Sequence, residues 1–399
     1  MKKNILFIGF SSYSFLNFYE KLIIKNSKKF NIYIITDYVE DFYTKKLENL
    51  KKKKFIKNFY YVNGCTSNRI FFKGFFQAHR VVSELKKVNF YKIVSSDSSK
   101  PEVEFIIKKL KKIAKVYAFN HHSYKYYNIK FDLNFLIRFK IKSLIRYLKF
   151  RLNQIGKNIL LSYLFFQRIP EKIFIRESFP LYSNYVDTYL TDKIHEFYFY
   201  NKQFPYINIK KINRYSKNKV KNNNLLLLGT FVKNKNYEKV IVSKTSNYIE
   251  IMRKKFKIKN IYYKPHPRCD NNFFNELIRV NPKLKINFIE KYENSEDIIK
   301  KFKYIIGYDS STLQDAANLF NGNIVIGLND LASLLTWDPK PKILMGDFNQ
   351  FKSGIIWVND LSALRKFDNK KLTDFSNKLQ MERFNFFRNS RLYEREVLN

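Results

Sequence analysis

The chain has 399 residues, 45% of them hydrophobic, so it is long enough for two domains and too apolar to be disordered over most of its length. Its 75 Lys and Arg outnumber 34 Asp and Glu, and this net charge of +41 favours polyanionic partners: phosphorylated substrates, anionic lipid headgroups or nucleic acid. The two cysteines, Cys65 and Cys269, lack metal-ligand spacing, which favours a reduced, cytosolic protein without disulfides or a zinc site.

The N-terminal residues are basic and then briefly apolar. This pattern predicts a first buried strand and not a signal peptide. No stretch reaches the ~18 uninterrupted apolar residues of a membrane span. We therefore expect a cytoplasmic protein that is not integral to a membrane.

The first 120 residues alternate short apolar runs, rich in β-branched and aromatic residues, with longer amphipathic runs. The short runs predict strands at 4–10, 30–36, 59–62, 91–95 and 115–119. Helical patterns separate them, for example at 75–87 and 102–112. Such alternation is typical of a parallel sheet with helices on both faces, in which ligands bind beyond the carboxyl ends of the strands.

A second α/β pattern follows a polar, Asn- and Lys-rich stretch at 207–224, which we interpret as a linker. Its predicted strands are 225–229, 261–263, 286–289, 304–306 and 323–326. The sequence therefore predicts an α/β protein with two Rossmann-like domains that face a cleft, at 1–206 and 225–360. Residues 361–399 are predicted to form helices that cross back to the first domain.

A basic insertion is predicted at 133–170 in the first domain. It contains no acidic residue, and its basic residues alternate with bulky apolar ones. A helix of this kind is typical of a segment that lies on an anionic membrane surface. The alternative interpretation is a helix packed on the domain with a solvated basic face. The basic residues are Arg138, Lys140, Lys142, Arg146, Lys149, Arg151, Lys157 and Arg168.

The segment YYKPHPR at 262–268 follows a predicted strand directly. The prolines on both sides of His266 restrict the backbone to extended geometry, so the strand ends there and presents the imidazole at its carboxyl end. Lys264 and Arg268 add positive charge. The group suits a nucleotide phosphate; the simpler alternative is a loop histidine that only turns the chain.

The segment GYDSSTL at 307–313 follows another predicted strand and precedes a helix. Asp309, Ser310 or Ser311 can cap this helix, whose first N–H groups would then form an anion site. Capping alone is the simpler interpretation. The pairing favours a phosphate site, because two anion-binding strand ends lie about 40 residues apart in one α/β domain.

These segments resemble the motifs of a known family. NIYYKPHPR and GYDSSTL resemble the His-Pro and Ser-Ser motifs of bacterial lipooligosaccharide sialyltransferases and capsular polysialyltransferases. LLLLGTFV at 225–232 resembles the start of their nucleotide-binding domain. The resemblance covers roughly 225–328 and, more faintly, 91–128.

The resemblance implies the two-domain GT-B fold, a CMP-sialic acid donor and catalysis without a metal. His266 would contact the CMP phosphate and act as an acid on it, and Ser310 and Ser311 would hold the same phosphate. The donor-binding residues expected in the second domain are Gly229, Lys264, His266, Pro267, Arg268, Ser310, Ser311 and Thr312.

The first domain departs from the family pattern. The family carries an acidic pair followed by Gly after the strand that corresponds to 115–119, and one carboxylate serves as the catalytic base. Here residues 119–123 read FNHHS. We expect His121 or His122 to supply the base, because imidazole removes a hydroxyl proton readily at neutral pH. Asp97, after the strand at 91–95, is the reserve candidate.

We therefore expect an inverting glycosyltransferase that moves sialic acid or a related acidic sugar from a CMP donor to a surface glycan or glycolipid, at the inner membrane surface. An alternative is a GT-B transferase with another donor, such as a CDP-alditol or CMP-Kdo. A nucleic-acid-binding protein is disfavoured, because no RNP or KH motif occurs and basic residues are spread along the whole chain. A catalytically silent membrane adaptor would need the basic insertion but not His266.

Overall fold

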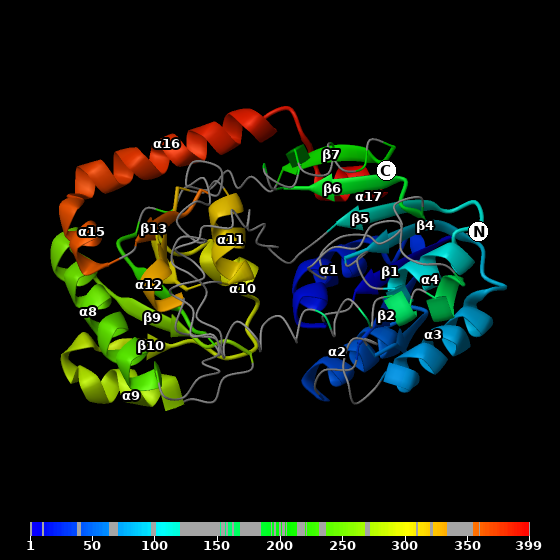
Figure 1. The fold of residues 1–399 in the computed structure, drawn as a ribbon, viewed down its shortest axis with the longest axis horizontal. Helices are drawn as coiled ribbons and strands as arrows, with labels where there is room; N and C mark the ends of the chain where they lie inside the picture. Colours follow the sequence, from blue (N-terminus) through cyan, green and yellow to red (C-terminus); the bar gives the residue numbers. More distant parts are fainter. Residues whose placement is uncertain are drawn as a thin grey trace.

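The computed structural model describes most of both halves of the chain. The described ranges are 2–9, 12–37, 41–63, 71–96, 101–119, 159–161, 163–167, 185–192, 197–198, 206–213, 222–230, 237–267, 272–308, 310–319, 322–332, 354–358 and 360–398, with the single positions 152, 156, 194, 201, 204 and 220. Two separate α/β domains are visible within them (Figure 1).

The N-terminal domain is built on an eight-stranded parallel sheet of order β14-β7-β6-β5-β4-β1-β2-β3. The central strands are apolar because helices cover both faces of the sheet there; the last five residues of β1, for example, are all buried. The strands are β1 (Lys3–Gly9), β2 (Phe30–Thr36), β3 (Asn58–Tyr61), β4 (Phe90–Ser95), β5 (Lys115–Phe119), β6 (Thr188–Thr191), β7 (Asn208–Asn213) and β14 (Arg391–Leu392).

Helices connect β1 to β5 in chain order, because parallel neighbours need a long crossover connection. Each helix turns an apolar face inward; in α2, the buried side chains are spaced at helical intervals. The helices are α1 (Ser12–Asn26), α2 (Asp41–Lys52), α3 (Phe71–Leu85) and α4 (Pro101–Leu110).

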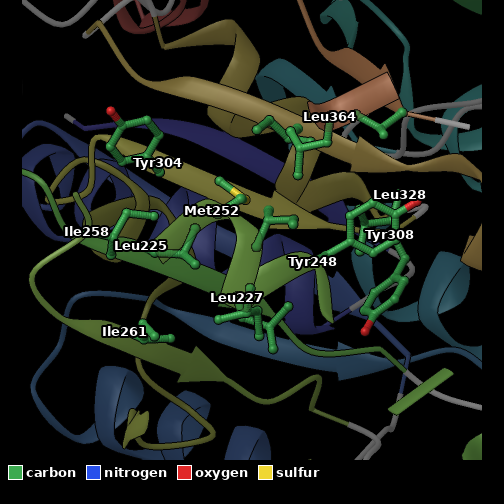
Figure 2. Close-up of a cluster of buried hydrophobic side chains, with 14 of the residues drawn as sticks. Leu225, Leu227, Tyr248, Met252, Ile258, Ile261, Tyr304, Tyr308, Leu328 and Leu364 are labelled. Atoms are coloured by element: carbon green, nitrogen blue, oxygen red, sulfur yellow. The ribbon is translucent and has the colours of Figure 1, made fainter. Parts of the chain in front are cut away.

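The C-terminal domain repeats the arrangement with a six-stranded parallel sheet of order β10-β9-β8-β11-β12-β13. All four residues of β8, a run of leucines, are buried. Figure 2 shows the core on one face of this sheet, where side chains from α8 pack against the strands. The strands are β8 (Leu225–Leu228), β9 (Ile261–Lys264), β10 (Ile286–Phe288), β11 (Tyr304–Gly307), β12 (Ile324–Leu328) and β13 (Ile356–Val358).

Most helices of this domain connect its strands along the chain, and two follow the last strand. They are α8 (Glu238–Phe256), α9 (Asn272–Val280), the 3-10 turn η3 (Pro282–Leu284), α10 (Ser295–Ile299), α11 (Ser311–Asn318), α12 (Asn329–Ala332), α15 (Leu361–Lys366) and α16 (Asn369–Phe387).

The end of the chain returns to the N-terminal domain. Helix α16 runs from the C-terminal domain toward β7, and α17 (Tyr393–Leu398) packs on the N-terminal sheet (Figure 1). The hydroxyls of Tyr393 and Tyr19 lie 2.6 Å apart, and the Lys92 ammonium donates to the Val397 carbonyl at 2.8 Å. Strand β1 and helix α17 therefore belong to one domain.

The stretch 207–224 is not simply a linker, which corrects the sequence-based boundary. Its first part forms β7, between β6 and β14 of the N-terminal sheet. The polar composition predicted a linker because β7 is only half buried and contains two lysines, which form an ion pair and a hydrogen bond. Lys210 pairs with the Glu396 carboxylate, and the Lys211 ammonium donates to the Phe386 carbonyl at 3.2 Å.

The two domains also touch through α1, α2 and the segment that follows β10. The rings of Phe42 and Tyr292 are stacked, with centroids 4.3 Å apart and an angle of 13° between the planes. The Lys21 ammonium lies 2.5 Å from an Asp297 carboxylate oxygen. None of the helices in the described ranges combines the length and hydropathy that spanning a bilayer requires.

Candidate functional site

The candidate site lies at the carboxyl ends of three neighbouring strands in the C-terminal sheet. The chain adds β9 and β10 on one side of β8 and then returns to add β11 on its other side. The strand order reverses at this point, which is where open parallel sheets bind their ligands. Gly229 follows β8, His266 follows β9 and Ser310 follows β11. Since adjacent strands lie ~4.8 Å apart, the ends of β9 and β11 are separated by roughly 10 Å.

Gly229 allows the backbone at the end of β8 to lie close to the backbone of the His-Pro turn. Its N–H donates to the Lys264 carbonyl at 2.7 Å, which extends the pairing of β8 with β9. A Cβ at this position would lie 2.7 Å from the Tyr263 hydroxyl and 3.0 Å from the His266 nitrogen. A larger residue therefore could not bring the end of β8 against the His-Pro turn.

His266 is presented as its flanking prolines predict. Strand β9 ends at Lys264, Pro265 is buried, and His266 and Pro267 are half-buried at the start of the turn. Proline lacks an N–H and fixes φ, so the strand cannot continue and the imidazole stands at the sheet edge. A partly exposed imidazole at this edge can donate a hydrogen bond to an anion.

Ser310 caps helix α11. Its backbone is extended, with φ −131° and ψ 152°, and its hydroxyl oxygen accepts from the Leu313 N–H at 3.1 Å. The capping interpretation is therefore correct for Ser310, and it is compatible with ligand binding because the hydroxyl can still donate its own proton. Ser311 and Thr312 form the first turn of α11, whose N–H groups and dipole favour an anion.

The Lys264 side chain is buried and hydrogen-bonded within the domain. It is only 4% exposed, and its ammonium donates to the Lys291 carbonyl at 2.5 Å. Burial lowers its pKa to about 8, while the carboxylates of Glu293 and Glu290 oppose the shift. Its ammonium thus ties β9 to the segment after β10, the segment that carries Tyr292.

Helix α8 makes polar contacts with residues that follow β11 and β12, and the sequence did not single these residues out. The Tyr308 hydroxyl lies 2.6 Å from the Thr245 hydroxyl of α8. The Asp330 carboxylate, which follows β12, accepts from Tyr248 at 3.1 Å and lies 3.6 Å from the Lys244 ammonium. Burial raises the pKa of Asp330, and the Tyr248 and Lys244 contacts oppose this rise. The signal available in the sequence was an acidic residue two positions after an apolar strand.

Four of the predicted site residues lie outside the described residues: Arg268 in the C-terminal domain, and Asp97, His121 and His122 in the N-terminal domain. The strand ends that precede the last three are described. Strands β4 and β5 pair in parallel, with Ser95 opposite Ala118. Most of the insertion 133–170 also lies outside the described ranges.

No metal cluster is evident where the structure describes the chain. In those ranges, no three His, Cys, Asp or Glu side chains gather closely enough to hold an ion. The expectation of metal-independent chemistry stays a prediction.

Three solved structures share the two-domain arrangement. A UGT transferase from Siraitia grosvenorii in complex with UDP aligns with a TM-score of 0.53 at 9% identity, over 100% of both chains. CalG4, the calicheamicin glycosyltransferase, aligns with a TM-score of 0.50 at 8% identity, over 96% of this chain and 94% of that chain. A UDP-glucosyltransferase from Polygonum tinctorium gives a TM-score of 0.50 at 7% identity, with the same coverage.

At such low identity, the likeness concerns the fold alone. No protein-family model matches the sequence, and no curated protein matches it either. The fold class predicted from the sequence is confirmed: the chain has the GT-B fold, with two parallel-sheet α/β domains.

Proposed function

We propose that this protein is a glycosyltransferase whose C-terminal domain binds the phosphate of a nucleotide-sugar donor. The observation that carries the proposal is the convergence of Gly229, His266 and the capped N-terminus of α11 at the carboxyl ends of three adjacent strands. A glycine that admits close backbone approach, an imidazole and a helix N-terminus together suit a phosphate.

The proposed reaction is a single displacement with inversion. An acceptor hydroxyl oxygen forms a bond to the anomeric carbon while the bond from that carbon to the donor phosphate oxygen breaks. The electron pair of the broken bond stays on the phosphate, where His266 and the first turn of α11 stabilise the charge. The acceptor proton passes to a base on the N-terminal side of the cleft, which we assign from the sequence to His121 or His122, with Asp97 in reserve.

We further propose that the donor is a CMP-activated sialic acid or a related acidic sugar. The support is the resemblance of the His-Pro and Ser-Ser segments, together with a net charge of +41 that favours an acidic sugar and an acidic acceptor. Another nucleotide sugar at the same phosphate site is the alternative. UDP belongs among the candidates because one solved structure with this fold contains it.

A nucleotide panel tests both levels of the proposal. Calorimetry with CMP, UDP, GDP and ADP measures binding directly, and thermal shift reports it because a ligand that binds only the folded protein stabilises it more as the ligand concentration rises above the Kd. Binding of CMP alone supports the CMP donor, and binding of UDP alone overturns it while keeping the phosphate site. If no nucleotide binds and no donor is hydrolysed, the glycosyltransferase assignment fails.

We also propose that the acceptor is reached at an anionic membrane surface. The described part of the insertion packs Phe165 against Phe75 and Phe105, with ring centroids 4.9 and 4.7 Å apart. Next to this aromatic cluster, apolar side chains face outward, and the Lys108 ammonium lies 5.2 Å from the Phe166 ring. The outward-facing residues are Phe76, Leu160, Tyr163 and Leu164. Exposed apolar groups beside lysines suit a bilayer with anionic headgroups.

A further inference from the structure

A buried polar cluster joins the two domains at the opposite end of α11 from the candidate phosphate site. It consists of Asp192, directly after β6 of the N-terminal domain, Asn318 at the end of α11, and Arg383 in α16. These residues are 3%, 1% and 1% exposed. We refer to the three residues as the interdomain cluster.

Hydrogen bonds connect all three members. The Asn318 amide nitrogen donates to an Asp192 carboxylate oxygen at 2.9 Å. The Arg383 guanidinium donates to the Asp192 carbonyl at 2.7 Å and to the Asn318 amide oxygen. Asn318 therefore donates toward one domain and accepts from α16, a combination that only an amide side chain offers here.

The surroundings of the cluster are tightly packed and mostly apolar, with the buried Gln314 amide as a polar neighbour. The Arg383 guanidinium lies 5.7 Å from the Phe387 ring, and Phe387 packs with Ile194. A Cβ on Gly354 would lie 2.9 Å from the Arg383 Cδ. Charged groups are costly in such a place, and apolar residues of similar volume often stabilise a fold at least as well. Hydrogen bonds fix distances and angles between their partners, so this cluster favours one relative orientation of the two domains.

Helix α11 links this cluster to the candidate site. Ser310 caps its N-terminus and Asn318 is its last residue, so a helix about 12 Å long separates the two. The helix is packed firmly, since Leu313, Ala316 and Ala317 are buried in the core below it. A short, packed helix moves as a rigid body, and a shift at one end is transmitted to the other.

We propose that Asp192, Asn318 and Arg383 are positioning residues that couple anion binding at the N-terminus of α11 to the orientation of the N-terminal domain. The inference rests on the proposed function. It adds that the donor phosphate, by holding α11, sets the angle at which the acceptor side of the cleft meets the donor. Figure 1 shows α16, which carries Arg383, extending from one domain toward the other.

An exchange of two side chains tests the coupling. Asn318→Asp replaces the amide donor with a carboxylate oxygen that faces the Asp192 carboxylate, but it keeps an acceptor for Arg383. In the exchange variant, which adds Asp192→Asn, the amide at position 192 donates to the carboxylate at position 318. The hydrogen bond then runs in the opposite direction, and the net charge equals that of the wild type. Ser376→Ala is the matched control, because Ser376 is also buried on α16 but its hydroxyl donates to the Asn323 carbonyl of the C-terminal domain and accepts from Gln380 of the same helix, so both printed contacts stay on one side of the domain boundary.

The first readout needs no ligand. Single-molecule energy transfer between dyes on the two domains should give one narrow distance distribution for the wild type, the exchange variant and Ser376→Ala. Asn318→Asp should broaden it. If Asn318→Asp does not fold, Asn318→Ala removes the same cross-domain bond and is interpreted in the same way.

The second readout is binding of CMP and UDP. Asn318→Asp should weaken binding of whichever nucleotide the wild type takes by about fivefold or more, and the exchange should recover most of this loss. If Asn318→Asp behaves like Ser376→Ala in both readouts, or if the exchange fails to restore the distance distribution, the coupling is refuted. If the wild type binds neither nucleotide, the proposed donor and the coupling to it both fail, and a change in the distances then shows only that the interdomain cluster orients the two domains.

Discussion

At the scale of single residues, Gly229 makes a steric demand that can be measured. Gly229→Ala would place a methyl group 2.7 Å from the Tyr263 hydroxyl and 3.0 Å from two backbone atoms of the His-Pro turn. We expect the free energy of unfolding to fall by about 1–3 kcal/mol and nucleotide binding to weaken. Urea unfolding and calorimetry would measure the two effects. Gly156→Ala is the control, because a Cβ there meets nothing within 4 Å; equal losses in both variants would refute the steric account.

Ser310 combines two roles that substitutions can separate. Ser310→Asp keeps a good cap for α11, so we expect stability to change little, but it places a negative charge where the phosphate is proposed to bind. Nucleotide affinity should fall by tenfold or more, as calorimetry would show. The control is Asp368→Ala, which removes the cap of α16, where Asp368 accepts from the Lys371 N–H at 2.7 Å. It should cost about 1 kcal/mol of stability with no loss of affinity. Unchanged nucleotide binding in Ser310→Asp would remove α11 from the site.

Lys264 should make stability depend on pH in the alkaline range. Burial lowers its pKa from the ordinary 10.5 to about 8, so between these values the unfolded chain binds a proton that the folded chain does not. The free energy of unfolding should therefore rise with pH from about 8 toward 10.5, and this contribution is lost as pH falls through 8. The measurement is urea unfolding at several pH values for the wild type and Lys264→Met. A wild-type minus variant difference that is flat across this range would contradict the expectation.

At the scale of elements, the apolar runs predicted most strands to within two residues. Strand β2 and strand β5 have the predicted bounds, because a strand covered on both faces must be continuously apolar. Strand β7 was missed, since its half-buried lysines are stabilised by residues 175 and 186 positions away. Strand β14 was missed as well, because two residues carry no periodic pattern.

In the candidate site too, local sequence effects were predictable and contacts between distant segments were not. The prolines beside His266 predicted its place at a strand end because their effect is local. The Lys264 ammonium, by contrast, donates to the carbonyl of Lys291, which lies 27 positions away in the segment after β10, so no local pattern predicts its direction. The interdomain cluster could not be predicted either, because its three residues are isolated polar positions in three distant segments. Only the folded arrangement brings Asp192, Asn318 and Arg383 together.

The surface formed by α3 and the described part of the insertion gives a prediction about membranes. Phe76 and Tyr163 are 65% and 59% exposed. The double variant Phe76→Ser, Tyr163→Ser should bind anionic vesicles more weakly than the wild type, because each buried apolar side chain contributes about 1.5–3 kcal/mol. Vesicle co-sedimentation would measure this, and wild-type binding should decline in high salt. Met381→Ser is the control, since Met381 is equally exposed but lies on α16. Equal binding by all three proteins would leave the surface without a membrane role.

At the scale of the whole molecule, the contact between Phe42 and Tyr292 should hold the domains together. The pair of Lys21 and Asp297 is exposed and contributes little, whereas a stacked aromatic pair contributes about 0.5–1.5 kcal/mol. Tyr292→Ala should therefore raise the population of separated domains by about two- to twelvefold, as interdomain energy transfer would report. Phe288→Ala is the control, because Phe288 contacts Phe274 within its own domain. A shift of the same size in both variants would argue against a specific role for the stack.

The return of the chain to its first domain affects how the protein is made. Strand β14 and α17 complete the N-terminal sheet, yet about 180 residues separate them from β7. At roughly 5–20 residues per second, translation of that stretch lasts roughly 10–40 s, during which the domain that emerges first has an uncovered edge. The pocket that later receives Tyr393 and Val397, beside Tyr19 and Phe119, is then open to water and to chaperones. The N-terminal domain begins to fold first and is completed last.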